Sequence, residues 1–178
     1  MAKNSREQIL KDQKKIVREL SKNANKSINE IAKTCGFSRQ KVWRIIKNLE
    51  NNNTIWGYTA VIDDEKQDMK RYMVLIKRSV QPMSLDIVNK IIDRELIKKS
   101  DGLKIDIMNS FYTSGQYDWV ICFNAPEIKI AKKFVEVVAK LFSGYISDIQ
   151  LVEELFAAQK CGIANPEIEK LREYFGET

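Results

Sequence analysis

Polar and cationic side chains are concentrated between residues 38 and 48: Ser38, Arg39, Gln40, Lys41, Arg44, Lys47 and Asn48. At helical spacing, the face opposite the apolar Val42, Ile45, Ile46 and Leu49 carries Gln40, Lys41, Arg44, Lys47 and Asn48, with Ser38 and Arg39 at the helix N-terminus. A guanidinium group can read guanine and an amide can read adenine in the major groove of DNA, whereas an ammonium group mostly contacts phosphate. The pattern therefore predicts a DNA-binding helix face made by these seven residues. Trp43 falls at the border of the two faces, where we expect it to pack on the first helix or on a partner.

A second group of candidate residues shares one predicted turn, S-G-Q-Y-D: Ser114, Gly115, Gln116, Tyr117 and Asp118. Gly115 permits a tight turn whose backbone N–H groups face outward, a shape suited to a carboxylate. Asp118 accepts hydrogen bonds when it is ionised and can hold an ammonium group, while Tyr117 offers a ring and a hydroxyl. These residues predict a small-molecule site for an amino acid. The alternative is a plain hairpin turn in which Asp118 bonds its own backbone.

The residue types that the chain lacks restrict its chemistry. It has no histidine, the commonest general base and metal ligand, and no G-x-S-x-G, P-loop or G-x-G-x-x-G motif. Cys35, Cys122 and Cys161 are far apart, which indicates neither a disulfide framework nor a zinc site and favours a reducing cytoplasm. No apolar run has the length of a membrane span. We therefore expect a cytoplasmic protein that is not an enzyme and holds no metal or cofactor.

The predicted DNA-binding face needs helices to position it. Apolar spacing predicts a helix over 6–22, a second that begins with a capping box at Ser27 and ends at Gly36, and a third that Ser38 caps and that runs to about residue 52. Two short helices joined by a tight turn, the second one basic, predict a helix-turn-helix, and residues 54–63 predict a strand after it. Residues 1–60 carry 13 lysines and arginines against 5 acidic residues, whereas residues 61–178 carry 17 against 19. The positive charge therefore lies on the helical end, as in polyanion-binding modules.

The second half predicts a different architecture. Strands are expected over 71–79, 104–114, 117–125 and 146–158, with helices over 84–99 and from about residue 126 to 142. The order β-α-β-β-α-β is that of the ferredoxin-like split βαβ. Segments 72–76 and 119–123 are apolar on both faces, although two helices cover only one face of a four-stranded sheet. A second copy of the same sheet is the expected cover for the other face.

These patterns predict the fold class α+β, with a three-helix, winged-type helix-turn-helix joined to a ferredoxin-like sandwich. The predicted boundaries are a helix-turn-helix domain over 1–62, a linker over 63–70, a ferredoxin-like domain over 71–163 and a helical extension over 164–178.

Several stretches resemble the Lrp/AsnC family of transcription regulators. Residues 23–63 contain the motifs S-x-x-E-I-A, G-F-S and L-E-x-x-x-x-I-x-G-Y-T-A, and SGQYDWVICF (114–123) is similar to the family's G-x-Y-D turn before an apolar strand. The chain departs from the family at Ile45, where an arginine is usual, and at Asn53, where a glycine is usual. The resemblance implies an N-terminal DNA-binding domain and a C-terminal sandwich that dimerises through its sheet. It also implies assembly to tetramers or octamers and an amino acid bound near the G-x-Y-D turn.

We therefore expect a sequence-specific transcription regulator, dimeric or larger, that binds double-stranded DNA and is modulated by an amino acid. Two alternatives remain open. One is a metabolite-sensing or assembly protein whose basic helices serve only solubility. The other is an enzyme like the siroheme decarboxylases, which share this two-domain plan but rely on histidines that the chain lacks.

Overall fold

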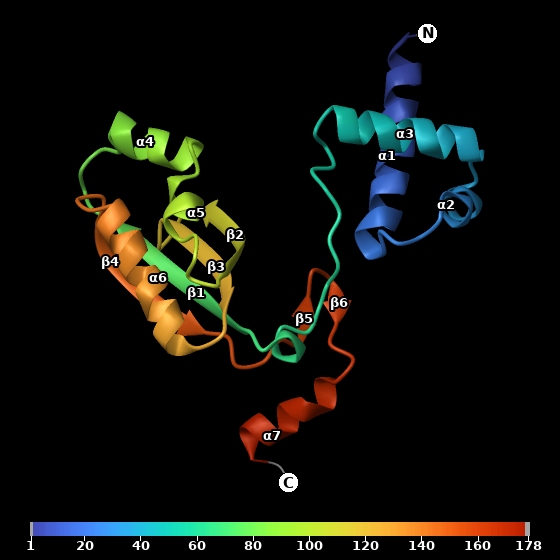
Figure 1. The fold of residues 1–178 in the computed structure, drawn as a ribbon. Coiled ribbons are helices and arrows are strands. Elements are labelled where there is room, and N and C mark those ends of the chain that lie inside the picture. Colours follow the sequence, from blue (N-terminus) through green and yellow to red (C-terminus); the bar gives the residue numbers. More distant parts are fainter. Residues whose placement is uncertain (1, 177–178) are drawn as a thin grey trace. The chain divides into compact units, whose positions relative to one another are not determined.

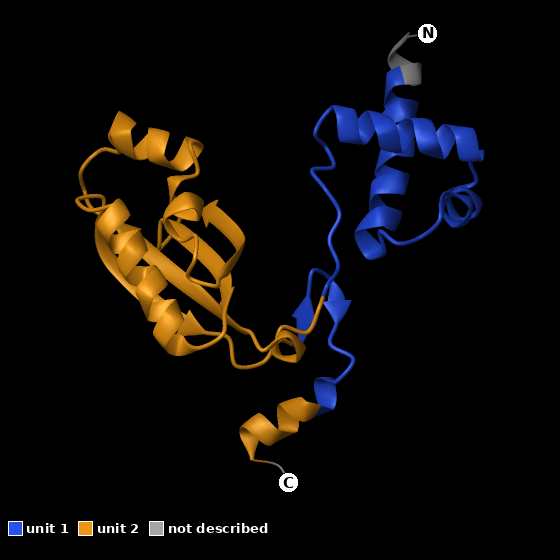
Figure 2. Cartoon of the chain, viewed as in Figure 1, with its two compact units in different colours: residues 1–61, 158–169 blue, residues 62–157, 170–178 orange. Residues whose placement is uncertain are grey.

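The computed structural model describes residues 2–176, with side chains from residue 6 onward. The chain divides into two compact units, residues 1–61 with 158–169 and residues 62–157 with 170–178 (Figure 2). The first unit is mainly helical, and the second contains a sheet with helices (Figure 1), so the predicted α+β class is confirmed. Within the described residues, no helix has both the length and the apolar character of a membrane span.

Three helices build the first unit: α1 (Ala2–Lys22), α2 (Ile28–Cys35) and α3 (Arg39–Asn51). The first begins earlier than the predicted residue 6. Their apolar stripes meet in one core, whose buried members are Ile16, Ile31, Ala32, Val42, Ile45 and Leu49. Burying a side chain of the size of isoleucine or leucine contributes about 1.5–3 kcal/mol, so this core holds α3 in place and turns its polar face outward.

The predicted ends of α2 and α3 are confirmed. In the capping box, the Glu30 backbone N–H donates to Ser27 Oγ at 3.2 Å, and the Ser27 N–H donates to Glu30 Oε2 at 2.8 Å. Gly36 ends α2 in the left-handed region with φ of 71°, a conformation that glycine adopts without strain. Ser38 then caps α3 by accepting from the Lys41 N–H at 3.3 Å. An N-cap contributes about 1 kcal/mol, so these residues define the turn between the two helices.

The strand predicted over residues 54–63 is wrong. The Ile55 N–H donates to the Leu49 carbonyl at 2.9 Å, and Ile55 packs against the helical core. The following residues form no strand within the described chain. Their β-branched and aromatic side chains suit an extended backbone, but a strand also needs a neighbour to accept its hydrogen bonds. Trp56 is 94% exposed in this segment.

The second unit contains a four-stranded antiparallel sheet made of β1 (Lys70–Arg78), β2 (Asp106–Tyr112), β3 (Trp119–Ala125) and β4 (Ile146–Glu153). Its helices are α4 (Leu85–Ile92), α5 (Glu95–Lys99) and α6 (Ile128–Leu141). The strand order β2-β3-β1-β4 is that of the ferredoxin-like fold, so the predicted topology is confirmed. The single helix predicted over 84–99 is instead two helices, because Arg94 between them is left-handed with φ of 54°.

A buried polar cluster holds the segment that leads into β1. A short 3-10 turn, η1 (Glu65–Gln67), follows Asp64, whose side chain is almost fully buried. The Asp64 carboxylate lies 2.9 Å from the Arg71 guanidinium and accepts from Asn124 Nδ2 at 2.8 Å. Arg71 Nε also donates to Asn124 Oδ1 at 3.3 Å. Asp64, near the start of the predicted linker, is therefore attached to β1 and β3 by mutually satisfied hydrogen bonds.

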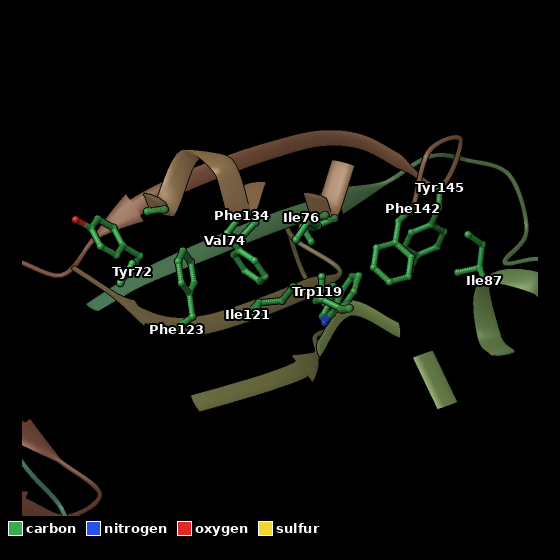
Figure 3. Packing of buried hydrophobic residues seen from close by; sticks show 14 residues of the cluster. Tyr72, Val74, Ile76, Ile87, Trp119, Ile121, Phe123, Phe134, Phe142 and Tyr145 are labelled. Atoms are coloured by element: carbon green, nitrogen blue, oxygen red, sulfur yellow. The ribbon is translucent and has the colours of Figure 1, made fainter. Parts of the chain in front are cut away.

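The hydrophobic core of the second unit lies on one face of the sheet. Alternate residues of the two central strands are buried there: Tyr72, Val74 and Ile76 of β1 with Trp119, Ile121 and Phe123 of β3. They pack against α6 through Phe134 and Val138. In Figure 3 the side chains form a continuous row from Tyr72 at one end to Ile87 at the other. Alternation along each strand thus commits one set of side chains to this core.

The opposite face carries the other set of side chains. Met73 and Leu75 of β1 lie opposite Cys122 and Val120 of β3, and Phe111 of β2 lies opposite Val120. We call these five residues the open face. The four central ones are only partly buried within the described chain, and Phe111 is 47% exposed. The prediction that both faces of the central strands are apolar is therefore confirmed.

The chain after β4 differs from the prediction. The strand expected to reach residue 158 ends at Glu153, and a small hairpin follows, made of β5 (Gln159–Lys160) and β6 (Ile163–Ala164). The helical extension expected over 164–178 is reduced to η2 (Ile168–Lys170) and α7 (Leu171–Phe175). Tyr174 of α7 packs on Phe156, with ring centroids 5.6 Å apart.

Candidate nucleic-acid interface

The outward face of α3 carries two rows of exposed side chains. Arg39, Trp43 and Lys47 recur every fourth residue and form one row, and Gln40, Arg44 and Asn48 form the next. Ser38, also exposed, caps the N-terminal end of both rows. Six of the seven residues predicted from the sequence therefore lie on one exposed surface, which we call the α3 face and define as these two rows with Ser38.

A broad open hollow of about 910 Å³ adjoins the first turns of α3. It is lined by Ile28, Ser38, Arg39, Gln40, Lys41, Trp43 and Arg44. Ile28 opens α2, so the hollow lies where the starts of the two helices approach each other. Backbone N–H groups at helix starts favour negative charge, as do the guanidinium groups beside them. The arrangement suits a phosphate backbone and the groove next to it.

The two arginines are available for an external partner. Arg39 and Arg44 are exposed and form no ion pair or side-chain hydrogen bond with any other residue in the described part of the chain. A planar guanidinium with five donors can bind a base edge or a phosphate through two hydrogen bonds at once. These two side chains are therefore the strongest candidates for direct contacts.

Lys41 is the predicted residue that the tertiary structure uses internally. Its Nζ lies 2.6 Å from Asp12 Oδ2 on α1 and 4.1 Å from the centre of the Phe37 ring. The hydrogen bond from Lys41 is the main cause that lowers the pKa of Asp12, and Gln8 Nε2 adds a second hydrogen bond at 2.8 Å. Asp12 is nearly fully buried. Lys41 therefore neutralises a buried carboxylate between α1 and α3.

Lys47 has a weaker internal partner. Its Nζ lies 2.8 Å from Glu50 Oε2, and Glu50 also accepts a hydrogen bond from the Tyr58 hydroxyl at 3.1 Å. These bonds lower the pKa of Glu50, the one from Lys47 most. An exposed ion pair of this kind contributes little to stability, because water and salt screen it. Phosphate can therefore replace Glu50 as the partner of Lys47 at little loss.

Trp43, which the sequence placed at the border of the two faces and which we expected to pack on the first helix or on a partner, is mostly exposed in this chain. Its side chain is 54% exposed and belongs to the same row as Arg39 and Lys47. Counting in steps of four from Arg39 would have placed it there. The apolar character of the indole concealed the position, since large apolar residues on a helix usually face a core.

The predicted effector turn is a well-bonded hairpin in the second unit. Ser114, Gly115 and Gln116 are exposed. Asp118 Oδ2 accepts from the Arg78 backbone N–H at 2.9 Å, and Asp118 Oδ1 lies 3.2 Å from Arg78 Nε. The Tyr117 hydroxyl donates to Gln150 at 2.7 Å. Asp118 thus bonds the neighbouring strand β1 and not its own backbone.

Comparison with known proteins agrees with this geometry. Residues 13–55 match the family model described as a winged helix-turn-helix DNA-binding domain. No curated protein matches the chain by sequence.

Solved structures share the fold over most of the chain. An AsnC family transcriptional regulator from Agrobacterium tumefaciens is 19% identical with a TM-score of 0.61, covering 84% of this chain and 92% of its own. The leucine response regulatory protein of Mycobacterium tuberculosis is 15% identical with a TM-score of 0.64, covering 84% and 94%. A transcriptional regulator from Neisseria meningitidis, solved in complex with L-methionine, is 16% identical with a TM-score of 0.61, covering 84% and 92%. The chain therefore has the two-part fold of these regulators.

Proposed function

We propose that this protein is a dimeric, sequence-specific transcription regulator of the Lrp/AsnC type that works in the cytoplasm. One observation carries the proposal: the α3 face presents Arg39 and Arg44, without internal partners among the described residues, on the second helix of a helix-turn-helix. Exposed guanidinium groups on that helix can form hydrogen bonds with base edges in the major groove of DNA.

The α3 face divides the contacts by chemistry. Arg39 and Arg44 bind guanine edges, and the amides of Gln40 and Asn48 bind adenine. Lys47 exchanges Glu50 for a phosphate, while Ser38 and the start of α3 face the phosphate backbone. Lys41 takes no part in contacting DNA, since it remains with Asp12 and holds α3 on α1. Lys41 thus positions the helix, and the neighbouring side chains contact the DNA.

The open face supports dimerisation through the sheet. Met73, Leu75, Phe111, Val120 and Cys122 form a continuous apolar strip whose exposure in a lone chain is unfavourable. A second copy of the same face buries both strips around a twofold axis. Two α3 helices in such a dimer read two half-sites about 34 Å apart. Further assembly of dimers is part of the proposal.

The hairpin from Ser114 to Asp118 is the proposed amino-acid site. Exposed backbone N–H groups around Gly115 suit the carboxylate, and the Asp118 carboxylate, already held by Arg78, retains lone pairs for an ammonium group. The structural neighbour with bound L-methionine supports an amino acid as the ligand class. No enzymatic step is proposed, because the chain has no histidine and no motif for nucleophilic or phosphoryl chemistry.

Selection of genomic fragments by the purified protein tests the main proposal. The expected result is enrichment of a site with two related half-sites, bound with an affinity that falls steeply with salt. The variant with both Arg39→Ala and Arg44→Ala is the matched control, because neither side chain has an internal role and the fold should be unaffected. Enrichment by this variant of the same sites as the wild type would contradict the assignment of the α3 face.

A further inference from the structure

We propose that Trp43 is a specificity-determining residue that contacts thymine methyl groups in the major groove. The inference rests on the proposed DNA-binding function and adds to it a residue outside the polar set. Its basis is an exposed indole in a surface that is otherwise cationic and polar.

Trp43 lies where a partner bound to the α3 face would contact it. It lies between Arg39 and Lys47 in one row of the α3 face, beside Arg44 in the next row, and it lines the hollow at the start of α3. Any polyanion that engages Arg39 and Lys47 on either side must also meet the indole between them. The side chain is 54% exposed, so a large apolar surface is available to that partner.

The chemistry of the indole restricts what it can recognise. It has one N–H donor and no acceptor, so it is poorly suited to read the polar edge of a base pair. The C5-methyl group of thymine is the apolar group that B-DNA presents in the major groove, and apolar side chains contact it there. Because cationic residues surround Trp43, its partner must offer an apolar group flanked by negative charge. A thymine between phosphates meets both conditions.

This contact would give the protein a preference for thymine over cytosine at positions where it forms no hydrogen bond with the base. Loss of one buried methyl group weakens binding about fourfold. The same discrimination should appear between thymine and deoxyuridine, which pair identically and differ only in that methyl group.

A deoxyuridine scan of the selected site tests the inference. Each thymine of one half-site is replaced in turn by deoxyuridine, and the affinity of full-length protein is measured at fixed salt. The expected result is a loss of about fourfold at one or two adjacent thymines, with no loss at those positions for Trp43→Ala. Trp56→Ala is the matched control, since Trp56 is 94% exposed in the same unit but lies outside α3, and it should keep the wild-type pattern.

The other outcomes separate the two proposals. If wild type binds DNA but tolerates deoxyuridine at every thymine, the methyl contact does not exist and the inference is overturned while the proposed function stands. If wild type selects no DNA at all, the proposed function fails and the inference fails with it. If Trp43→Ala sediments as a monomer where wild type is a dimer, the indole packs on a second protein chain, which also overturns the inference.

Discussion

The ammonium group of Lys41 lies 2.6 Å from the nearly buried carboxylate of Asp12, so that an ion pair fastens α3 to α1. The pair gives Lys41 an internal partner, whereas Arg39 and Arg44 on the same helix have none among the described residues. It also separates the role of Lys41 from that of Lys47, although both are lysines of α3 that the sequence assigned to DNA binding.

Lys41→Met should lower the stability of the first unit by about 1–2 kcal/mol, because it leaves the carboxylate of Asp12 without its main donor. The loss is smaller than for a fully buried pair, since the Lys41 side chain is 36% exposed and solvent screens the interaction. Thermal unfolding measures the loss. Lys47→Met, which breaks only the exposed pair with Glu50, is the control and should leave the unfolding temperature nearly unchanged. On DNA the order reverses: Lys47→Met should reduce the salt slope by about one unit, and Lys41→Met should leave it unchanged.

Acid should remove the contribution of the same pair. Lys41 holds the pKa of folded Asp12 below its usual 3.8. A lowered folded-state pKa gives stability that is fully present above the unfolded pKa and is lost as the pH falls through the folded pKa. The stability difference between wild type and Asp12→Asn should therefore be constant near pH 6 and shrink as the pH falls below about 3.8. Unfolding measured at a series of pH values checks this, and a difference that grows with acid would be evidence against the pair.

Arg44→Ala should weaken binding to the selected site by about 1–3 kcal/mol and flatten the base preference at one position of each half-site. The reason is the loss of a bidentate contact that no other side chain replaces. Arg44→Lys keeps the charge without the planar fork and should recover the salt dependence but not the preference. Binding to a panel of single-base variants of the site measures both. An equal loss on selected and random DNA would reduce Arg44 to a phosphate contact.

If the chain dimerises through the open face as proposed, Leu75→Glu should make it monomeric, because the substitution places a charge at the centre of that face. Sedimentation velocity of the full chain measures the change. Ile128→Glu is the matched control: Ile128 is 43% exposed at the start of α6, away from the open face, and the variant should stay dimeric. DNA affinity should fall when dimerisation is lost, because each monomer then binds a single half-site without the gain from a linked second contact. A Leu75→Glu protein that remains dimeric would place the interface elsewhere.

Asp118→Ala should abolish the heat of binding of an effector amino acid in calorimetry, since the ammonium group loses its acceptor. Asp118→Asn retains an oxygen for the Arg78 N–H but has no charge, so it separates the effect on the hairpin from the effect on the ligand. Binding that survives both substitutions would leave residues 114–118 as a turn only.

Much of the fold was predictable because its signals are local. Ser27, Gly36 and Ser38 act within four residues of their own positions, and the caps that they predict are present. The two apolar faces of β1 and β3 follow from their continuous apolar runs, because successive side chains of a strand point to opposite faces. Helical spacing likewise predicts that the arginines and the amide residues of α3 lie on its outward face.

The errors have two causes: a strand that depends on a distant partner, and local turns with positive φ angles. Residues 54–63 have the composition of a strand, but whether a strand forms depends on a neighbour, which the described chain does not offer there. The break at Arg94 and the hairpin around Gly162 were missed, since both rest on positive φ angles that side-chain patterns did not indicate.

The amino-acid sequence by itself thus determined the ends of α2 and α3, the order of the elements from α1 to β4 and the set of polar and cationic residues on α3. Only the tertiary structure decided which of these residues are available to bind DNA. Lys41 and Lys47 are both lysines on one helix, yet Lys41 meets a carboxylate 29 positions earlier in the chain and Lys47 meets an exposed neighbour. Trp43 is exposed because the core formed by α1, α2 and α3 closes on the opposite side of the helix. Burial and pairing are properties of packed elements, and local spacing cannot specify them.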